Sequence, residues 1–427
     1  MIPLSHSPRP MIIECTPAET VGRSTLTRVA GGLTRRFAGL LVLGTALLGA
    51  CQADSSAPDP TPGPTPAAFV PKDEIIGSNF LQVEFSDDSR SMVWIEAIGG
   101  GRAKVYYADV NLTTGLPDLA GKQYVDTILG QGWPYWGADS QGPFFLLQNE
   151  SGQLRYFRRS GTNTLTAHTL SPLNADQKSL LNVSHDPGRP YFWVSYVVKS
   201  SVASTKDSLF CLRSDAPGTR VFVAAEVKNT AGSAYELTFP RWLKNSETLL
   251  YPFRGNPAQP VFDIKLWNGQ TGTSTLATND GAAFHHVDDL AFALNGQQYL
   301  SSSRNAGRLT ICQQQAGGLY TEIESHATPT AIQPYTLTSF EPFAFDGRVY
   351  GAYQVYAGGG IPGSTKGEIW LKGILGEPAH LKISTLDGVT VDPEYVVGPN
   401  KVWVYYYGKP VGQQTFDLHR CETPLTR

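Results

Sequence analysis

Hydrophobic and polar positions follow one another along the chain in a repeating order: an apolar residue, then a polar turn, then a hydrophobic strand. In the first example, Phe85 precedes the polar turn 86–90, and the apolar run 92–95 follows. Seven apolar residues hold the leading position, at separations of 51, 47, 59, 50, 51 and 52 residues: Phe85, Trp136, Val183, Trp242, Phe292, Phe343 and Tyr395. We call these residues the anchors. Their regular spacing indicates seven copies of one structural repeat.

A second strand-like motif keeps the same period, as at residues 104–109, 154–157 and 262–265. A further apolar run usually follows, for example at 221–223, and no unit contains a convincing amphipathic helix. Four antiparallel strands in a period of about 50 residues are typical of a β-propeller. We therefore expect an all-β fold made of a single β-propeller with seven four-stranded blades, and we consider a six-bladed ring the weaker alternative.

The two ends of the repeat region suggest how the ring closes. Only six residues follow Cys421, which is too few for a full outer strand. The segment Glu74–Gly77 precedes the first repeat and has no partner of its own. We expect Glu74–Gly77 to pair beside the strand at Phe416–Arg420 and so complete the last blade.

The repeats combine a Pro-x-aromatic motif with a polar turn, most clearly at 134–140 and 240–242. This pattern resembles the propeller repeats of TolB, a component of the Tol-Pal system, and of its relatives. The resemblance covers the whole repeat region, although the usual Pro-Asp-Gly turn is replaced here by sequences such as Asp88-Ser89 and Asp346-Gly347. It implies a β-propeller.

The N-terminal region has the features of an export signal. Arg35-Arg36 precedes the apolar run Phe37–Ala50, and fourteen residues are too few to cross a hydrocarbon core of about 30 Å as a helix. The sequence Leu48–Cys51 resembles the lipobox of bacterial lipoproteins, which implies that Cys51 becomes the lipidated first residue of the mature protein. The alternative is a conventional signal-peptidase site at which Cys51 is an ordinary small residue.

A proline-rich segment follows Cys51, with alternating prolines at 58–66 that favour an extended chain over a packed core. We expect three parts: a signal peptide at 1–50 that is removed, a lipidated cysteine with a linker at 51–71, and the propeller at 72–427. The lipoprotein resemblance implies a lipid-anchored protein of the bacterial cell envelope, on its periplasmic or surface face. Gln52 replaces the aspartate that typically retains lipoproteins at the inner membrane, which favours the outer membrane.

Composition narrows the classes of function. Charged residues make up 17% of the chain and the net charge is -3, so no basic surface for nucleic acid is visible. The sequence contains no Gly-x-Ser-x-Gly elbow, no His-Glu-x-x-His motif and no phosphate-binding glycine loop. We therefore expect no cofactor and assign no catalytic residue.

One segment is rich in metal-ligating side chains. His285, His286, Asp288 and Asp289 lie within five positions before the fifth anchor. Three interpretations remain: a metal site, a polar binding surface at the mouth of the channel, or an ordinary solvated loop. His185-Asp186 lies within a turn, and we interpret it as turn chemistry.

Loops that enter the innermost strands of a propeller open toward one end of the central channel. The repeat alignment predicts that Glu84, Arg241, Glu341, Asp392 and Glu394 gather there, so we take Arg241, Glu341 and Asp392 as further candidates for a channel-mouth binding site. The nearby aromatic residues Trp133, Tyr135, Phe239 and Phe340 either stack on a sugar or peptide or wedge between blades.

Two classes of function remain. The first is a lipid-anchored binding or scaffold module that presents one propeller face to an envelope protein or a glycan. The second is a carbohydrate-active enzyme, a lyase or hydrolase, with His285, His286, Asp288 and Glu341 as candidates at the channel mouth. Fold alone does not decide between them. Convergence of three or more carboxylates or histidines at one mouth within catalytic distance favours the enzyme, whereas a shallow face with scattered charges favours binding.

Three cysteines belong to the expected propeller: Cys211, Cys312 and Cys421. Each falls on the second strand-like motif of a different repeat, namely the third, fifth and seventh, so the three lie in non-adjacent blades. Because a disulfide needs Cα atoms within about 7 Å, we predict no bond between them.

Overall fold

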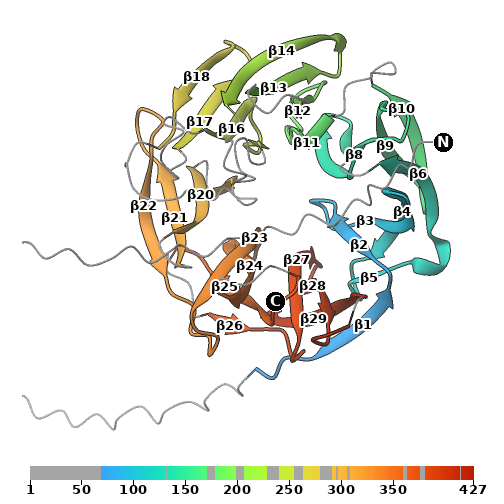
Figure 1. The fold of residues 1–427 in the computed structure, drawn as a ribbon, viewed down its shortest axis with the longest axis vertical. Coiled ribbons are helices and arrows are strands. Elements are labelled where there is room, and N and C mark those ends of the chain that lie inside the picture. The colour runs from blue at the N-terminus through green and yellow to red at the C-terminus, as the bar shows by residue number, and fades with distance from the viewer. Residues whose placement is uncertain are drawn as a thin grey trace, which may run out of the picture. The chain divides into compact units, whose positions relative to one another are not determined.

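The computed structural model describes residues 69–129, 132–170, 178–198, 206–227, 240–253, 263–278, 291–294, 297–304, 308–358, 363–375, 380–413 and 415–427. Pro71–Arg427 belong to one compact unit. Seven antiparallel sheets succeed one another around a central channel, which makes the fold a seven-bladed β-propeller (Figure 1). Among the described residues, no helix is long and apolar enough to span a membrane.

Each blade is named here by its order along the chain, and its strands run outward from the channel. Blades 1 to 3 contain β2 (Leu81–Phe85), β3 (Ser91–Gly99), β4 (Arg102–Asn111), β5 (Leu116–Pro117) and β6 (Gln123–Leu129), with the 3-10 helix η1 (Leu119–Gly121); then β7 (Tyr135–Asp139), β8 (Gly142–Gln148), β9 (Leu154–Gly161) and β10 (Thr164–Thr169); then β11 (Lys178–Val183), β12 (Trp193–Val198), β13 (Lys206–Arg213) and β14 (Ala216–Val227).

Blades 4 to 7 follow the same plan. They contain β15 (Arg241–Trp242), β16 (Thr248–Phe253), β17 (Asp263–Asn268) and β18 (Thr273–Leu276); β19 (Ala291–Leu294), β20 (Gln297–Arg304), β21 (Arg308–Gln314) and β22 (Tyr320–His326); β23 (Tyr335–Phe345), β24 (Arg348–Ala357), β25 (Gly367–Gly373) and β26 (Leu381–Lys382); and finally β27 (Val389–Val397), β28 (Lys401–Lys409), β29 (Asp417–Thr426) and β1 (Asp73–Ser78).

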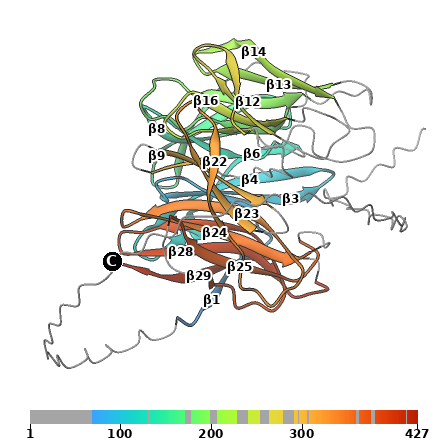
Figure 2. The same cartoon turned by 90° about the vertical axis from the view of Figure 1, so that its left-hand side faces the viewer.

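The ring closes through the first strand of the propeller. β1 pairs with β29 in antiparallel register, with Glu74 opposite Arg420 and Gly77 opposite Leu418. Figures 1 and 2 both show β1 beside β29. The predicted closure is therefore confirmed. It joins the two ends of the repeat region, so that blade 7 contains strands from both.

The anchors occupy the innermost strands in an equivalent register. Phe85 pairs with Met92, Trp242 with Leu249, and the other anchors likewise face the second strand of their own blade. Anchors also pack against the neighbouring blade. For example, the ring centroid of Phe85 in blade 1 lies 4.8 Å from that of Tyr405 in blade 7. Packing between adjacent blades explains why the second strands are apolar on both faces.

Blade 1 differs from the prediction of four strands, because its sheet has five. The ten-residue strand β4 is longer than its outer partners: β5 pairs with its last residues, Val110 and Asn111, and β6 pairs with Arg102–Tyr107. The chain turns back at once after β4 and then returns through η1. Two short segments therefore share the position of the outermost strand.

Candidate functional site

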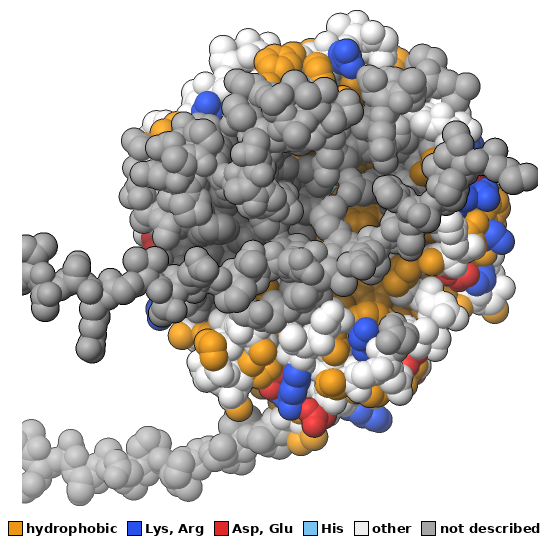
Figure 3. Space-filling model, in the orientation of Figure 1, with side chains coloured by type: hydrophobic (Ala, Val, Ile, Leu, Met, Phe, Trp, Pro, Cys, Tyr) orange, Lys and Arg blue, Asp and Glu red, His pale blue; other side chains and the backbone are white. Residues whose placement is uncertain are grey.

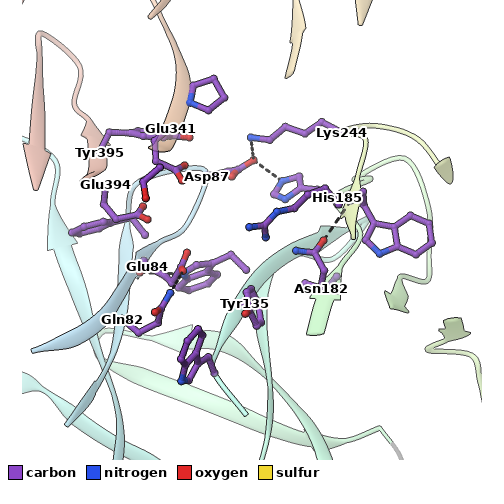
Figure 4. Close-up of a pocket in the computed structure, with 18 of the residues that line it drawn as sticks. Gln82, Glu84, Asp87, Tyr135, Asn182, His185, Lys244, Glu341, Glu394 and Tyr395 are labelled. Atoms are coloured by element: carbon purple, nitrogen blue, oxygen red, sulfur yellow. Dashed lines mark hydrogen bonds and ion pairs between the residues drawn. The ribbon is translucent and has the colours of Figure 1, made fainter. Parts of the chain in front are cut away.

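A cavity of about 340 Å³ lies among the innermost strands of the propeller (Figure 4). Its lining comes from blades 1, 2, 3, 4, 6 and 7, so it belongs to the central channel and not to any single blade. In Figure 3 the visible basic and acidic side chains lie interspersed toward the outer edge of the molecule. The cavity is the place in the described part of the chain where charged side chains from many blades meet.

Backbone bulges shape one side of this cavity. In blades 1, 6 and 7 the pairing of the innermost strand shifts at the same point, and the first residue of each bulge has a positive φ: 46° at Gln82, 49° at Ser339 and 55° at Asp392. Non-glycine residues adopt this conformation at a cost of about 1–2 kcal/mol, and bulges redirect side chains. All three residues line the cavity.

The next two positions of each bulge have opposite environments. The middle residue is turned into the protein, as Val83 and Phe340 show with exposures of 1% and 2%. In blade 6 this packing needs Gly351, because a Cβ there would collide with the Phe340 ring. The residue after it is a glutamate that lines the cavity in every case: Glu84, Glu341 and Glu394.

The neighbours of Glu84 include groups that raise its pKa and groups that lower it. Gln82 Nε2 donates a hydrogen bond to Glu84 Oε1 at 3.1 Å. Burial raises the pKa of Glu84 to about 7, and the negative charge of Asp392 adds to the rise, whereas the hydrogen bond from Gln82 and the charge of Arg241 oppose it. This carboxyl group therefore changes its protonation state near neutral pH.

The other two glutamates are perturbed in the same direction. Burial raises the pKa of Glu341 well above its ordinary value, and the charges of Glu84 and Asp392 raise it further. Burial is also the largest cause for Glu394, followed by the charges of Glu341, Glu84 and Asp392. In Figure 4 the carboxylates of Glu341 and Glu394 point toward one another. Like charges in a poorly hydrated space explain why these groups retain their protons.

The opposite side of the cavity carries a cross-channel ion cluster. Asp87 Oδ2 lies 2.8 Å from His185 Nε2 and 2.9 Å from Lys244 Nζ. Although burial favours the protonated acid, the charge of Lys244 and the hydrogen bond from His185 hold the pKa of Asp87 below its usual value. These three residues occupy equivalent turns, two positions after the anchors of blades 1, 3 and 4.

The predicted residues are distributed as follows. Arg241, Glu341 and Asp392 all line the cavity, together with Glu84 and Glu394, so the structure brings these five together. His285, His286, Asp288 and Asp289 lie outside the described residues, as does Cys51. Within the described ranges, no group of three His, Cys, Asp or Glu side chains is arranged to hold a metal ion.

The aromatic candidates differ in whether they reach the cavity or only pack between blades. Phe340 is a core residue, packed near Tyr353, and Phe239 lies outside the described residues. Trp133 and Tyr135 both pack against apolar clusters and line the cavity, and Trp136 joins them, with its Nε1 donating to the Glu84 backbone oxygen at 3.2 Å. The cavity therefore has an aromatic wall beside its acidic one.

Sequence reasoning missed part of this site. The turn interpretation holds for Asp186, whose Oδ1 accepts a hydrogen bond from Gly188 N at 3.0 Å, but the neighbouring His185 side chain lines the cavity. Asp87 and Lys244 were not singled out. One signal was present in the sequence: a polar residue, an apolar residue and then glutamate directly precede the anchor in repeats 1 and 7, with one more residue inserted in repeat 6.

No protein-family profile matches this sequence. No curated protein matches it at a significant level. Among solved structures, the chain resembles the β-propeller domain of the Trilobed protease from Pyrococcus furiosus, at 12% identity and a TM-score of 0.44, over 82% of this chain and 98% of that one. It also resembles a prolyl endopeptidase, at 10% identity and a TM-score of 0.45, over 78% of this chain and 47% of that one.

A third similar structure is the Trypanosoma rangeli sialidase in complex with sialic acid, at 9% identity and a TM-score of 0.42, over 73% of this chain and 56% of that one. The chain thus spans about half the length of the prolyl endopeptidase and of the sialidase.

Two kinds of chemistry are open to this arrangement. Carboxyl groups whose pKa values are raised can donate or accept protons near neutral pH. The same groups, once ionised, can hold a cationic ligand. Four carboxylates converge on the cavity: Glu84, Glu341, Asp392 and Glu394. Because the criterion stated above also requires catalytic distances between these groups, the convergence supports the enzymatic class without excluding the binding class.

Proposed function

We propose that this protein is an exported, lipid-anchored β-propeller of the bacterial outer membrane that binds a glycan in its central channel. In this proposal Cys51 carries the lipid, and the linker 51–71 separates the propeller from the membrane. The observation that carries the binding role is the composition of the cavity wall. Aromatic rings and a few converging polar groups are the usual lining of small-molecule sites, and this cavity has both.

The aromatic wall supplies the apolar contact of the proposed site. Trp133 and Trp136 are partly buried, so each presents part of its ring to the cavity. The glutamates on the facing bulges supply hydrogen-bond acceptors. A sugar ring has apolar faces and hydroxyl donors at its edge, and it matches this combination.

The test is a binding measurement of the mature protein against a panel of bacterial envelope glycans. We expect at least one glycan to bind, and we expect Trp133→Ala to weaken that binding about tenfold through the loss of aromatic contact area. Tyr124→Ala is the control, because Tyr124 is 51% exposed and does not line the cavity. Absence of binding to every glycan, or equal loss in both variants, would contradict the proposal.

A second candidate function is a carbohydrate-active hydrolase, and one observation favours it. Glycoside hydrolases pair a protonated carboxyl group with an ionised one, and Glu84, whose pKa is about 7, could act as the acid beside another carboxylate of the cavity. Release of new reducing ends from a bound glycan, abolished in Glu84→Gln, would support the enzyme. Binding without turnover over long incubation would support the binding module instead.

A further inference from the structure

The acidic side of the cavity contains a buried carboxylate that lacks a polar contact. Glu394 is 9% exposed and lines the cavity. Within the described part of the chain, its carboxylate accepts no hydrogen bond and forms no ion pair, whereas Glu84 is hydrogen-bonded by Gln82. A carboxyl group in such a place is costly to ionise without a partner, and native proteins retain one mainly where it has a role.

The charges around Glu394 do not compensate for it. Its electrostatic neighbours are Glu341, Glu84 and Asp392, which repel an ionised carboxylate, and Arg241, which attracts it. When all of them are ionised, four carboxylates face one guanidinium. Lys244, the other cation that lines this part of the channel, is already paired with Asp87 at 2.9 Å. Glu341 and Glu394 relieve this repulsion by retaining their protons, and a cation bound in the cavity can take the place of those protons.

The arrangement of the carboxylates indicates which kind of cation the cavity can bind. The described carboxylates are not arranged as a metal site. An ammonium group, in contrast, has three donors that can be shared among several carboxylates, and it needs no fixed coordination polyhedron. Partly exposed aromatic rings on the facing wall leave room for the organic part of such a ligand.

We propose that Glu84, Glu341 and Glu394 form an ammonium subsite, and that the ligand of this cavity is an amino sugar with a free primary amine. The inference rests on the proposed glycan-binding function and specifies its ligand class. The bulges of blades 1, 6 and 7 place the three carboxylates, and the aromatic wall of blade 2 contacts the sugar ring. Acetylation of the amine removes both its charge and two of its donors, so the subsite discriminates against N-acetylated sugars.

The affinity of the cavity for a cation should also depend on pH. Glu84 is faced by Gln82 on its own strand, by Tyr135 on β7, by Arg241 on β15, and by carboxylates on β23 and β27. Because its pKa lies at about 7 without ligand, an ammonium group binds best after Glu84 has lost its proton. Affinity should therefore increase between about pH 5.5 and 7, with release of protons on binding.

The experiment compares two ligands by calorimetry on the mature protein: the disaccharide of glucosamine and that of N-acetylglucosamine. We expect the free amine to bind about tenfold more tightly, and Glu394→Gln to abolish this difference by weakening binding of the free amine more than binding of the N-acetylated ligand. Glu422→Gln is the matched control, because Glu422 lies in the same blade, pairs with Lys401 and does not line the cavity.

The outcomes separate the two proposals. Equal affinity for both disaccharides would overturn the ammonium subsite and leave glycan binding intact. If neither disaccharide binds, pentylamine is the deciding probe: binding that Glu394→Gln abolishes would keep the ammonium subsite and reject the sugar ligand, and no binding would reject the subsite as well.

Discussion

Lys244 Nζ lies 2.9 Å from Asp87 Oδ2, although the two residues belong to blades 4 and 1 and are 157 positions apart in the chain. In a seven-bladed ring, these two blades are as far apart as any two can be. His185 of blade 3 contacts the same carboxylate oxygen at 2.8 Å. The turns that follow three anchors thus meet inside the channel, and their charged side chains bound the cavity on one side.

We predict that Lys244→Gln raises the pKa of Asp87 toward its ordinary value. Burial already favours the protonated acid, and the substitution removes the largest opposing charge. Stability should change by less than about 1 kcal/mol, because the two side chains are 39% and 34% exposed. Carboxyl-detected NMR titration measures the pKa. Lys401→Gln, which breaks a pair on the outside of blade 7, should leave Asp87 unchanged.

We predict that the free energy of unfolding decreases as the pH rises from 6.5 to 8, above the range in which the lowered pKa values of His380 and His419 act in the opposite direction. The unfolded chain releases the Glu84 proton near pH 4.5, whereas the folded protein holds it until about pH 7. Rising pH in this interval therefore favours the unfolded state, by at most about 1.4 kcal/mol per pH unit for each proton released. Denaturant titrations measure the slope, and Glu84→Gln should flatten it. A constant or rising stability would contradict the assigned pKa direction.

We predict that Asp73→Ala destabilises the ring closure by about 1–2 kcal/mol, because the buried Tyr406 hydroxyl and two exposed donors of Thr385 lose their acceptor. Asp73 Oδ2 accepts hydrogen bonds from Thr385 N at 2.7 Å, from Thr385 Oγ1 at 2.6 Å and from the Tyr406 hydroxyl. The neighbouring Glu74 is 53% exposed and pairs with Arg420, so Glu74→Ala should lower stability by less than about 1 kcal/mol. Equal losses in denaturant unfolding would show that the contacts of Asp73 contribute little.

We predict that Cys51→Ala releases the protein from the membrane. The proposed anchor is a lipid on this residue, and the remaining linker is polar and proline-rich. Detergent-phase partitioning of the expressed protein measures the change, with Ser56→Ala as a control in the same linker. Unchanged partitioning, or a mature N-terminus at another residue by mass spectrometry, would rule out the anchor.

We predict that Cys211, Cys312 and Cys421 react slowly with thiol reagents in the native protein and all react after denaturation without reductant. All three are buried cysteines in different blades, and none of them forms a disulfide. Burial raises the pKa of Cys421 to about 12 and also raises that of Cys211, so little reactive thiolate forms. A disulfide-linked pair of tryptic peptides would contradict the blade assignment of these residues.

Local pattern in the sequence was sufficient to predict the ring. Each blade is a contiguous stretch of chain whose strands pair with their sequence neighbours, so the period of the anchors predicted both the number of blades and the position of Phe85 and Trp242 on innermost strands. The closure by Glu74–Gly77 was predictable for the same reason, since one repeat lacked a strand and one strand lacked a partner. The pairing of both β5 and β6 with β4 in blade 1 was not predictable in this way, because it depends on the length of β4.

The composition of the cavity was decided by the tertiary structure. The repeat alignment could place Glu341 and Asp392 at one end of the channel, but the bulges at Gln82, Ser339 and Asp392 determine which side chains enter it. His185 had the sequence of a turn residue, and only the closed ring brings it to Asp87. Contacts across a ring depend on its radius and on the rotation of the backbone at each bulge. Both are properties of the assembled blades, and neither is encoded in the pattern of a single repeat.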